Sequence, residues 1–173
     1  NADLFLHQPD FRASERAFQL LSHIAGRAGR KEQGRVLIQT YNPFQETLQR
    51  IQQGEYTAMM TAQLTERSDF HYPPYYRLVR IIFRHRELER INQAGQWFAD
   101  GLRTGLAGYP VEVLGAEFPP ISRIRNEYIK HILLKIAPKA PLPMVKDYIL
   151  RLEQSFYSTA LFRPVILSYN VDP

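Results

Sequence analysis

The first apolar pattern along the chain has the spacing of a helix. Its members lie on one stripe: Ala17, Leu20, Leu21 and Ile24. Because Ser14 is a residue type that caps helix starts, we expect a helix over residues 14–25. Residues 35–41, rich in β-branched side chains, then predict a buried strand. A helix, a glycine turn and a strand together indicate an α/β fragment.

A second helical region is expected over residues 44–67. Its apolar positions again have helical spacing: Leu48, Ile51, Tyr56, Met59, Met60 and Leu64. Gly54 weakens this region in the middle, and the pair Pro73-Pro74 ends it. We therefore expect three parts: residues 1–42, a helical connector over residues 43–74, and a C-terminal domain over residues 75–173.

The C-terminal part shows strand and helix patterns in regular order. Strands are expected at 77–85, 111–115, 128–137 and 163–171, and helices at 88–106 and 142–157. The order βαββαβ is that of a ferredoxin-like fold, whose first and third strands lie side by side in an antiparallel sheet. Each helix has one apolar stripe, so both should cover the same sheet face and leave the other face open.

Alternation along the first and third of these strands predicts what each sheet face carries. The apolar members belong under the helices: Val79, Ile81, Phe83, Ile132, Leu134 and Ile136. The alternate positions should make the open face basic: Arg80, Arg84, His131 and Lys135, with Ile82 between the arginines. Arg123 and Arg125 precede the third strand, where we expect a basic loop.

The charge balance favours an anionic partner. The formal net charge is +5 at pH 7, and basic surfaces bind nucleic acid through phosphate contacts and counterion release. The chain has no cysteine, which excludes disulfides and fits a cytoplasmic protein. Its histidines are scattered and no apolar run approaches the roughly 20 residues of a membrane span, so we expect neither a metal site nor a membrane contact. A first residue other than Met suggests a piece of a longer protein.

Three basic side chains share one edge if the first predicted helix continues beyond residue 25. His23 and Arg27 are four residues apart, and Arg30 follows three residues later. Guanidinium groups stay charged and bind phosphate oxygens in a fork, so two arginines on one edge suit contact with a γ-phosphate. Spacing alone leaves a second interpretation open, which is a basic helix C-terminus favoured by the helix dipole.

The string at residues 23–30, His-Ile-Ala-Gly-Arg-Ala-Gly-Arg, resembles the sixth conserved motif of superfamily two helicases. That motif usually begins with Gln, for which His23 stands here. The resemblance implies that Arg30 is the arginine finger, that Arg27 contacts the γ-phosphate or the lobe interface, and that both belong with His23 to an ATP-facing surface. Residues 1–42 would then be the end of the second RecA-like lobe.

Flanking strings narrow the resemblance to the PriA family of primosomal replication-restart helicases. They are Asp-Phe-Arg-Ala-Ser-Glu-Arg at 10–16, Gly-Arg-Val-Leu-Ile-Gln-Thr at 34–40, Tyr-Pro-Pro-Tyr at 72–75 and Asn-Val-Asp-Pro at 170–173. The resemblance implies a full-length ATP-dependent three-prime to five-prime DNA helicase that uses ATP with magnesium and holds zinc. Such a helicase recognises stalled forks and D-loops and reloads the replicative helicase.

The resemblance also implies partners and limits. Forked or single-stranded DNA, single-stranded DNA-binding protein and other primosome proteins would be the partners. No Walker loop and no Asp-Glu-x-His box occurs in the sequence, so these residues alone should not hydrolyse ATP, and we expect them to bind neither ATP nor zinc. The predicted open face lacks stacked aromatic residues, which favours contact with the DNA backbone over base readout.

Two other functions stay open. In the first, the C-terminal domain is an adaptor that binds the acidic tail of single-stranded DNA-binding protein without touching DNA, with Lys139, Lys146 and Arg125 as anchors. In the second, it is an RNA-binding ferredoxin-like module unrelated to helicases. The string at residues 23–30 counts against the RNA-binding interpretation.

Overall fold

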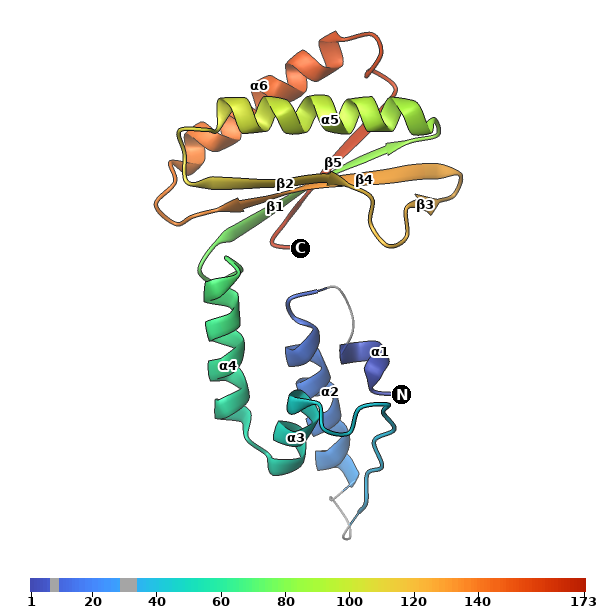
Figure 1. Ribbon diagram of the computed structural model, residues 1–173, viewed down its shortest axis with the longest axis vertical. Coiled ribbons are helices and arrows are strands. Elements are labelled where there is room, and N and C mark those ends of the chain that lie inside the picture. Colours follow the sequence, from blue (N-terminus) through green and yellow to red (C-terminus); the bar gives the residue numbers. More distant parts are fainter. Residues whose placement is uncertain (7–9, 29–33) are drawn as a thin grey trace. The chain divides into compact units, whose positions relative to one another are not determined.

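The computed structural model describes residues 1–6, 10–28 and 34–173 (Figure 1). The chain divides into two compact units, Asn1–Phe70 and His71–Pro173. Each unit has its own buried apolar cluster. The three-part division expected from the sequence, with its helical connector, stays a prediction.

The first unit is built of helices. They are α1 (Asp3–Leu6), α2 (Ala13–Ala28), α3 (Glu46–Gln53) and α4 (Tyr56–Asp69). The predicted helix at residues 14–25 is confirmed as α2, which continues to Ala28. The short α1 was not predicted, because four residues are too few to show a helical period.

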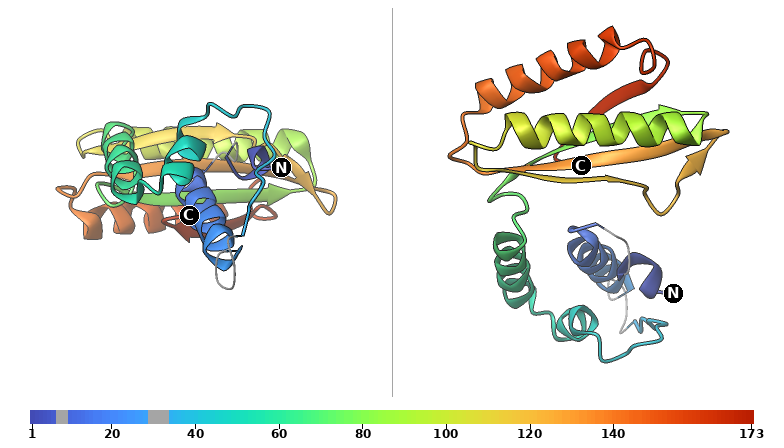
Figure 2. Two further views of the ribbon diagram at one scale, coloured as in Figure 1. Left: turned by 90° about the horizontal axis from the view of Figure 1, so that it is seen from below. Right: turned by 45° about the horizontal axis from the view of Figure 1, so that its top comes forward.

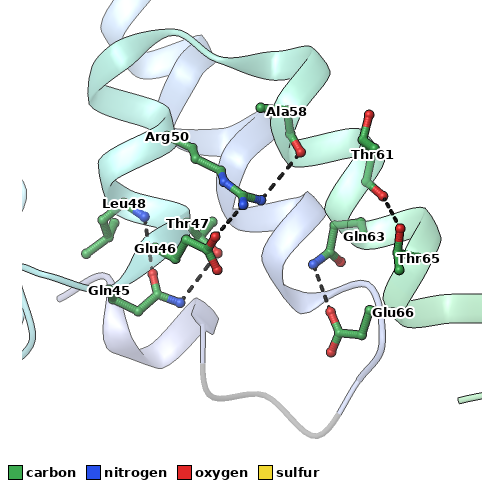
Figure 3. Close-up of polar contacts among 10 residues, drawn as sticks. All are labelled: Gln45, Glu46, Thr47, Leu48, Arg50, Ala58, Thr61, Gln63, Thr65 and Glu66. Carbon is green, nitrogen blue, oxygen red and sulfur yellow. Dashed lines mark hydrogen bonds and ion pairs between the residues drawn. The ribbon is translucent and has the colours of Figure 1, made fainter. Parts of the chain in front are cut away.

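The helical region predicted at residues 44–67 is two helices. At the start of α3 the Gln45 side chain accepts a hydrogen bond from the Leu48 N–H at 3.2 Å, and Gly54 ends the helix at φ 71°. Figure 3 shows this cap, and shows Arg50 of α3 turned toward Glu46 and toward the Ala58 carbonyl of α4. Gly54 breaks the helix because a residue without a Cβ takes a positive φ easily.

The strand predicted at residues 35–41 is wrong. The segment carries no strand assignment, and the described residues of this unit include no strand with which its backbone could pair. It contacts the start of the chain instead: the Ala2 N–H donates to the Gln39 carbonyl at 2.8 Å, and the Thr40 hydroxyl donates to Asp3 at 2.6 Å. The Leu37 side chain is 96% exposed. The predicted α/β fragment is therefore not seen in this unit.

The first unit has a small core. Ala2, Leu21 and Leu48 form its buried cluster, and Glu15 of α2 pairs with Arg67 of α4 at 2.6 Å. Two members of the apolar stripe on α2 stay outside this core and are at least a third exposed: Leu20 and Ile24. This unit therefore leaves part of its apolar surface uncovered.

The second unit contains a five-stranded antiparallel sheet. Its elements are β1 (Arg77–His85), α5 (Leu88–Gly105), β2 (Val111–Glu117), β3 (Arg123–Ile124), β4 (Glu127–Ile136), α6 (Leu142–Ser158) and β5 (Ile166–Val171). The strand order is β2-β4-β1-β5, with β3 paired to β4. The predicted first and third strands, β1 and β4, lie side by side in the middle as expected. The two-residue β3 was missed.

Both long helices of this unit lie on one side of the sheet. Figures 1 and 2 show α5 and α6 over the same face, and within residues 71–173 no helix covers the other face. The core between helices and sheet is rich in aromatic rings, with Phe83 and Phe98 centred 5.5 Å apart and Phe156 stacked on Phe162 at 4.9 Å. The mixed α/β domain therefore has one open sheet face.

Candidate nucleic-acid interface

The open face, defined here as the sheet face away from α5 and α6, carries the arginines that alternation predicted. On β1, Arg80 and Arg84 alternate with the fully buried Ile81 and Phe83. Arg84 is exposed and Arg80 is partly buried. Because the buried residues fill the helix side, the two guanidinium groups belong to the open side.

His131 lies in the middle of this face. It pairs with Ile82 across β1 and β4, and Glu117 of β2 is its other cross-strand partner. Burial lowers the pKa of His131 below its ordinary value, the positive charge of Arg80 lowers it further, and Glu117 partly opposes both. The imidazole of His131 therefore gains a proton less readily than that of a free histidine, and its predicted contact with DNA stays a prediction.

Lys135 is not exposed on this face, and the expectation that it would be is wrong. Its side chain is 7% exposed, and its Nζ lies 4.2 Å from the centre of the Tyr72 ring. Next to it His71 contacts Glu112 of β2 and stacks on Tyr76, with ring centres 4.2 Å apart. The segment that leads into β1 therefore covers this end of the sheet, and strand alternation alone gave no sign of it.

The open face is mixed rather than uniformly basic. Its register places aliphatic side chains beside the arginines: Ile82, Leu114, Ile129, Leu133 and Ile166. Two acids of β2, Glu112 and Glu117, lie opposite Lys135 and His131. The prediction of a basic face rested on the cations of β1 and β4. It did not count the aliphatic residues between them on those two strands, or the side chains that β2 and β5 add to the same face. Cationic character is therefore concentrated at Arg80 and Arg84.

Arg123 and Arg125 belong to a hairpin formed by β3, a two-residue turn and the start of β4. Arg123 lies over the Tyr128 ring at 4.9 Å and donates a hydrogen bond to Asn126. Arg125 and Asn126 form the turn at φ 49° and 65°, and both arginines are exposed. The predicted basic loop is therefore an ordered hairpin. Asn126 between alternating residues could have indicated the turn, because Asn tolerates positive φ.

The three anchors of the adaptor hypothesis do not come together. Arg125 lies in the turn before β4, whereas Lys139 and Lys146 follow the far end of that strand. Lys146, exposed on α6, lines a pocket of about 220 Å³ whose other lining residues include Ile149 and Val171. Arg125 is thus separated from the two lysines by the length of β4, and only the lysines lie near an apolar pocket.

The candidate nucleotide contacts lie in the first unit. His23 and Arg27 are both exposed in the last turns of α2, four residues apart on one edge. Arg30 lies outside the described residues. Ile24 is exposed between them, so this end of α2 presents a cationic and apolar edge.

In the described parts of the chain, no three His, Cys, Asp or Glu side chains are placed to share a metal ion. In the same residues no helix combines the length and apolar character that crossing a membrane requires.

Fold and site together define a class: a mixed α/β domain whose antiparallel sheet has helices on one face and two arginines, Arg80 and Arg84, on the other. Residues 68–173 match the family described as primosomal protein N C-terminal domain. The chain therefore belongs to the family of the C-terminal domain of the replication restart protein PriA.

Individual relatives agree with this assignment. The replication restart protein PriA of Bacillus subtilis is 34% identical over 151 residues, which cover 87% of this chain and 19% of that protein. The protein of the same name from Treponema pallidum is 36% identical over 142 residues, or 82% and 21% of the two chains. That of Chlamydia muridarum is 28% identical over 100% of this chain and 22% of its own. The chain thus spans about a fifth of the length of these relatives.

Proposed function

We propose that this chain is the C-terminal part of an ATP-dependent replication-restart DNA helicase, and that its second unit binds DNA. The observation that carries the DNA-binding proposal is the exposed Arg84 on the open face of β1, together with the exposed Arg123 and Arg125 on the hairpin that adjoins the same end of β4. Guanidinium groups on an exposed sheet suit phosphate oxygens, which fix position without reading sequence.

Neighbouring residues would tune this contact. Arg80 is partly buried and would reach a phosphate beside His131, which gains a proton more readily once an anion lies next to it. Lys135 is buried against Tyr72 and would add positive charge from behind the surface without touching a phosphate. The proposed contact set is therefore Arg84, Arg123 and Arg125, with Arg80 and His131 behind them.

The proposal includes the whole protein of which these residues form a part. It would unwind DNA in the three-prime to five-prime direction, using ATP with magnesium, and would hold zinc. It would act in the cytoplasm at stalled forks and D-loops with other primosome proteins. Residues 1–42 would complete a second RecA-like lobe, and residues 75–173 would be a ferredoxin-like domain. The motif string at residues 23–30 and the relatives' name support this picture.

DNA binding is testable with the chain as it exists. Fluorescence anisotropy with labelled forked DNA at about 50 mM salt should show binding that weakens steeply as salt rises. Arg84→Ala should weaken binding to all sequences alike and reduce the salt slope by about 1, as expected for one lost phosphate contact. Arg151→Ala is the matched control, because Arg151 is an exposed arginine on α6 that pairs with Asp147. Equal effects of the two substitutions would remove the open face from the interface.

A second function, docking of the acidic tail of single-stranded DNA-binding protein, is favoured by one observation. The pocket beside Lys146 adjoins a second pocket of about 230 Å³, with which it shares Ile136 and Leu142, and Pro138 and Ala140 on either side of Lys139 line that second pocket. Lysines beside these pockets, of which the one at Lys146 is lined by apolar side chains, suit a peptide that carries both acidic and apolar residues. Calorimetry with an acidic peptide and with forked DNA separates the two functions. Heat with the peptide alone, abolished by Lys146→Glu, would favour the adaptor.

A further inference from the structure

The β3–β4 hairpin, residues 123–128, has a turn that its sequence does not make easy. Both turn residues have a positive φ, 49° at Arg125 and 65° at Asn126, as in the two-residue turns that connect twisted strands. Asn adopts this conformation readily, but Arg does not, because its Cβ crowds the backbone there. A residue that breaks a local rule at an exposed turn points to a role for its side chain.

The hairpin is held in place at its base. Arg123 lies over the Tyr128 ring and bonds to Asn126, and the preceding loop begins at Phe118, whose ring centre is 4.9 Å from the Lys130 Nζ. Figure 1 shows the loop between β2 and β4 extending beyond the body of the sheet. The hairpin is therefore an ordered projection.

Two apolar side chains are exposed on this projection. Ile124 in β3 is 49% exposed, and Ile121 just before it is 67% exposed, beside the exposed Pro120. Aliphatic side chains presented between arginines are typical of elements that enter DNA, where the apolar group slides between bases and the cations hold the backbone. The surface therefore combines an apolar wedge with phosphate contacts.

The charges around the wedge are mostly positive. Within the part of the chain that the structure describes, Arg125 makes no hydrogen bond or ion pair, so its guanidinium is available. Arg84 pairs with Ile129, two residues into β4 from Glu127. Glu127 is the one acid of residues 123–128 and lies opposite Ile124. Two arginines against one carboxylate leave the hairpin cationic.

We propose that this hairpin is a wedge for branched DNA: Ile124, assisted by Ile121, inserts at the junction where paired strands separate, while Arg123 and Arg125 hold the flanking phosphates. Separating stacked bases costs free energy, and that cost is smallest where bases are already unpaired. An apolar wedge therefore favours a branch point over a linear duplex. This inference rests on the proposed DNA binding and adds to it the element that selects the DNA structure.

The test compares a forked DNA with a linear duplex of the same sequence, each carrying 2-aminopurine at the junction position. The wild-type chain should bind the fork more tightly and raise the fluorescence of the junction base as it unstacks. Ile124→Ser should bring the ratio of the two affinities close to one, leave the linear-duplex Kd unchanged and abolish the fluorescence rise. Ile121→Ser should do the same more weakly.

Control substitutions separate the effect of the wedge from a general loss of DNA binding. Leu150→Ser removes an aliphatic side chain of similar exposure, 57%, from α6 and should change neither signal. Arg125→Ala should weaken both complexes and lower the salt slope by about 1, and Glu127→Gln should strengthen both. If Ile124→Ser and Ile121→Ser, folded by circular dichroism, keep the wild-type preference and fluorescence, the wedge is overturned while DNA binding stands. If the wild-type chain binds neither DNA, both proposals are overturned.

Discussion

Neighbours determine what an ionisable side chain does on the open face. Lys135 and His131 both lie on β4 at positions where alternation predicts open-face cations, yet one is buried against Tyr72 and the other lies between Arg80 and Glu117. Burial disfavours the charged form of the imidazole, so the pKa of His131 falls below its ordinary value. Because the pKa of His131 differs between the folded and the unfolded chain, the free energy of unfolding depends on pH.

The free energy of unfolding should fall as the pH drops from about 7.5 to about 5.5. Since the pKa of His131 is lower in the folded than in the unfolded chain, the unfolded chain binds more protons across that window, and stability rises with pH. His131→Gln removes this contribution, so its unfolding free energy, measured by urea denaturation, should vary less with pH. His23→Gln, at an exposed position on α2, is the control. A pH profile unchanged by His131→Gln would contradict the effect.

At the scale of elements, the contact between α5 and α6 depends on glycines. Tyr148 of α6 donates a hydrogen bond from its hydroxyl to the Gly101 carbonyl of α5 at 2.7 Å. A Cβ on Gly105 would lie 1.8 Å from the Tyr148 ring, whereas one on Gly101 would meet the flexible end of Leu152 at 2.7 Å. The two helices therefore approach closely because no side chain separates them there.

Gly105→Ala should lower the free energy of unfolding by about 1–3 kcal/mol, the usual cost of overpacking a core. Gly101→Ala should cost less, because the Leu152 side chain has rotamers available and the Tyr148 ring does not give way as easily. Gly26→Ala is the opposite control: nothing lies within 4 Å of that Cβ in α2, so a gain of about 0.5–1 kcal/mol is expected. Urea denaturation of the three variants measures each change in the free energy of unfolding. Equal changes in the free energy of unfolding for Gly105→Ala and Gly26→Ala would contradict the close approach of α5 and α6 at Gly105.

At the scale of the whole molecule, the proposed nucleotide contacts are Arg27, in the last turn of α2, and Arg30, which follows that helix in the sequence. Arg27 is exposed on α2, and under the proposed function it and Arg30 would serve a nucleotide held by residues that this chain does not contain. Their action is therefore a property of the full-length protein. Such arginines stabilise charge in the transition state and not the bound DNA.

Arg30→Ala in the full-length protein should reduce DNA-stimulated ATP hydrolysis by about a thousandfold or more, the usual contribution of an arginine finger, while DNA binding stays near wild type. Steady-state ATP turnover and anisotropy on the same preparations measure the two effects. Arg16→Ala is the matched control, because Arg16 is an arginine of α2 that pairs with Asp10 at 2.6 Å. Unchanged turnover in Arg30→Ala would exclude it from the mechanism.

The local pattern of apolar residues was sufficient to predict most helices and strands of the second unit. The sequence predicts β1 at residues 77–85 and α5 from Leu88, and both begin there in the structure. It also predicts the central position of β1 and β4. These features depend on the periodicity of apolar side chains, which each segment carries by itself.

Strand pairing and side-chain burial depend on residues that are distant in the sequence, so they could not be predicted from one segment alone. The predicted strand at residues 35–41 has the right residue types but no neighbouring strand in its described unit, because strand formation requires a second backbone. β3 is too short to show a period. Lys135 is buried only because Tyr72, far away in sequence, packs on it. The sequence by itself therefore determined the long helices and strands of the second unit and the family motif. Tertiary structure decided which cations are exposed, since exposure depends on what folds over a side chain.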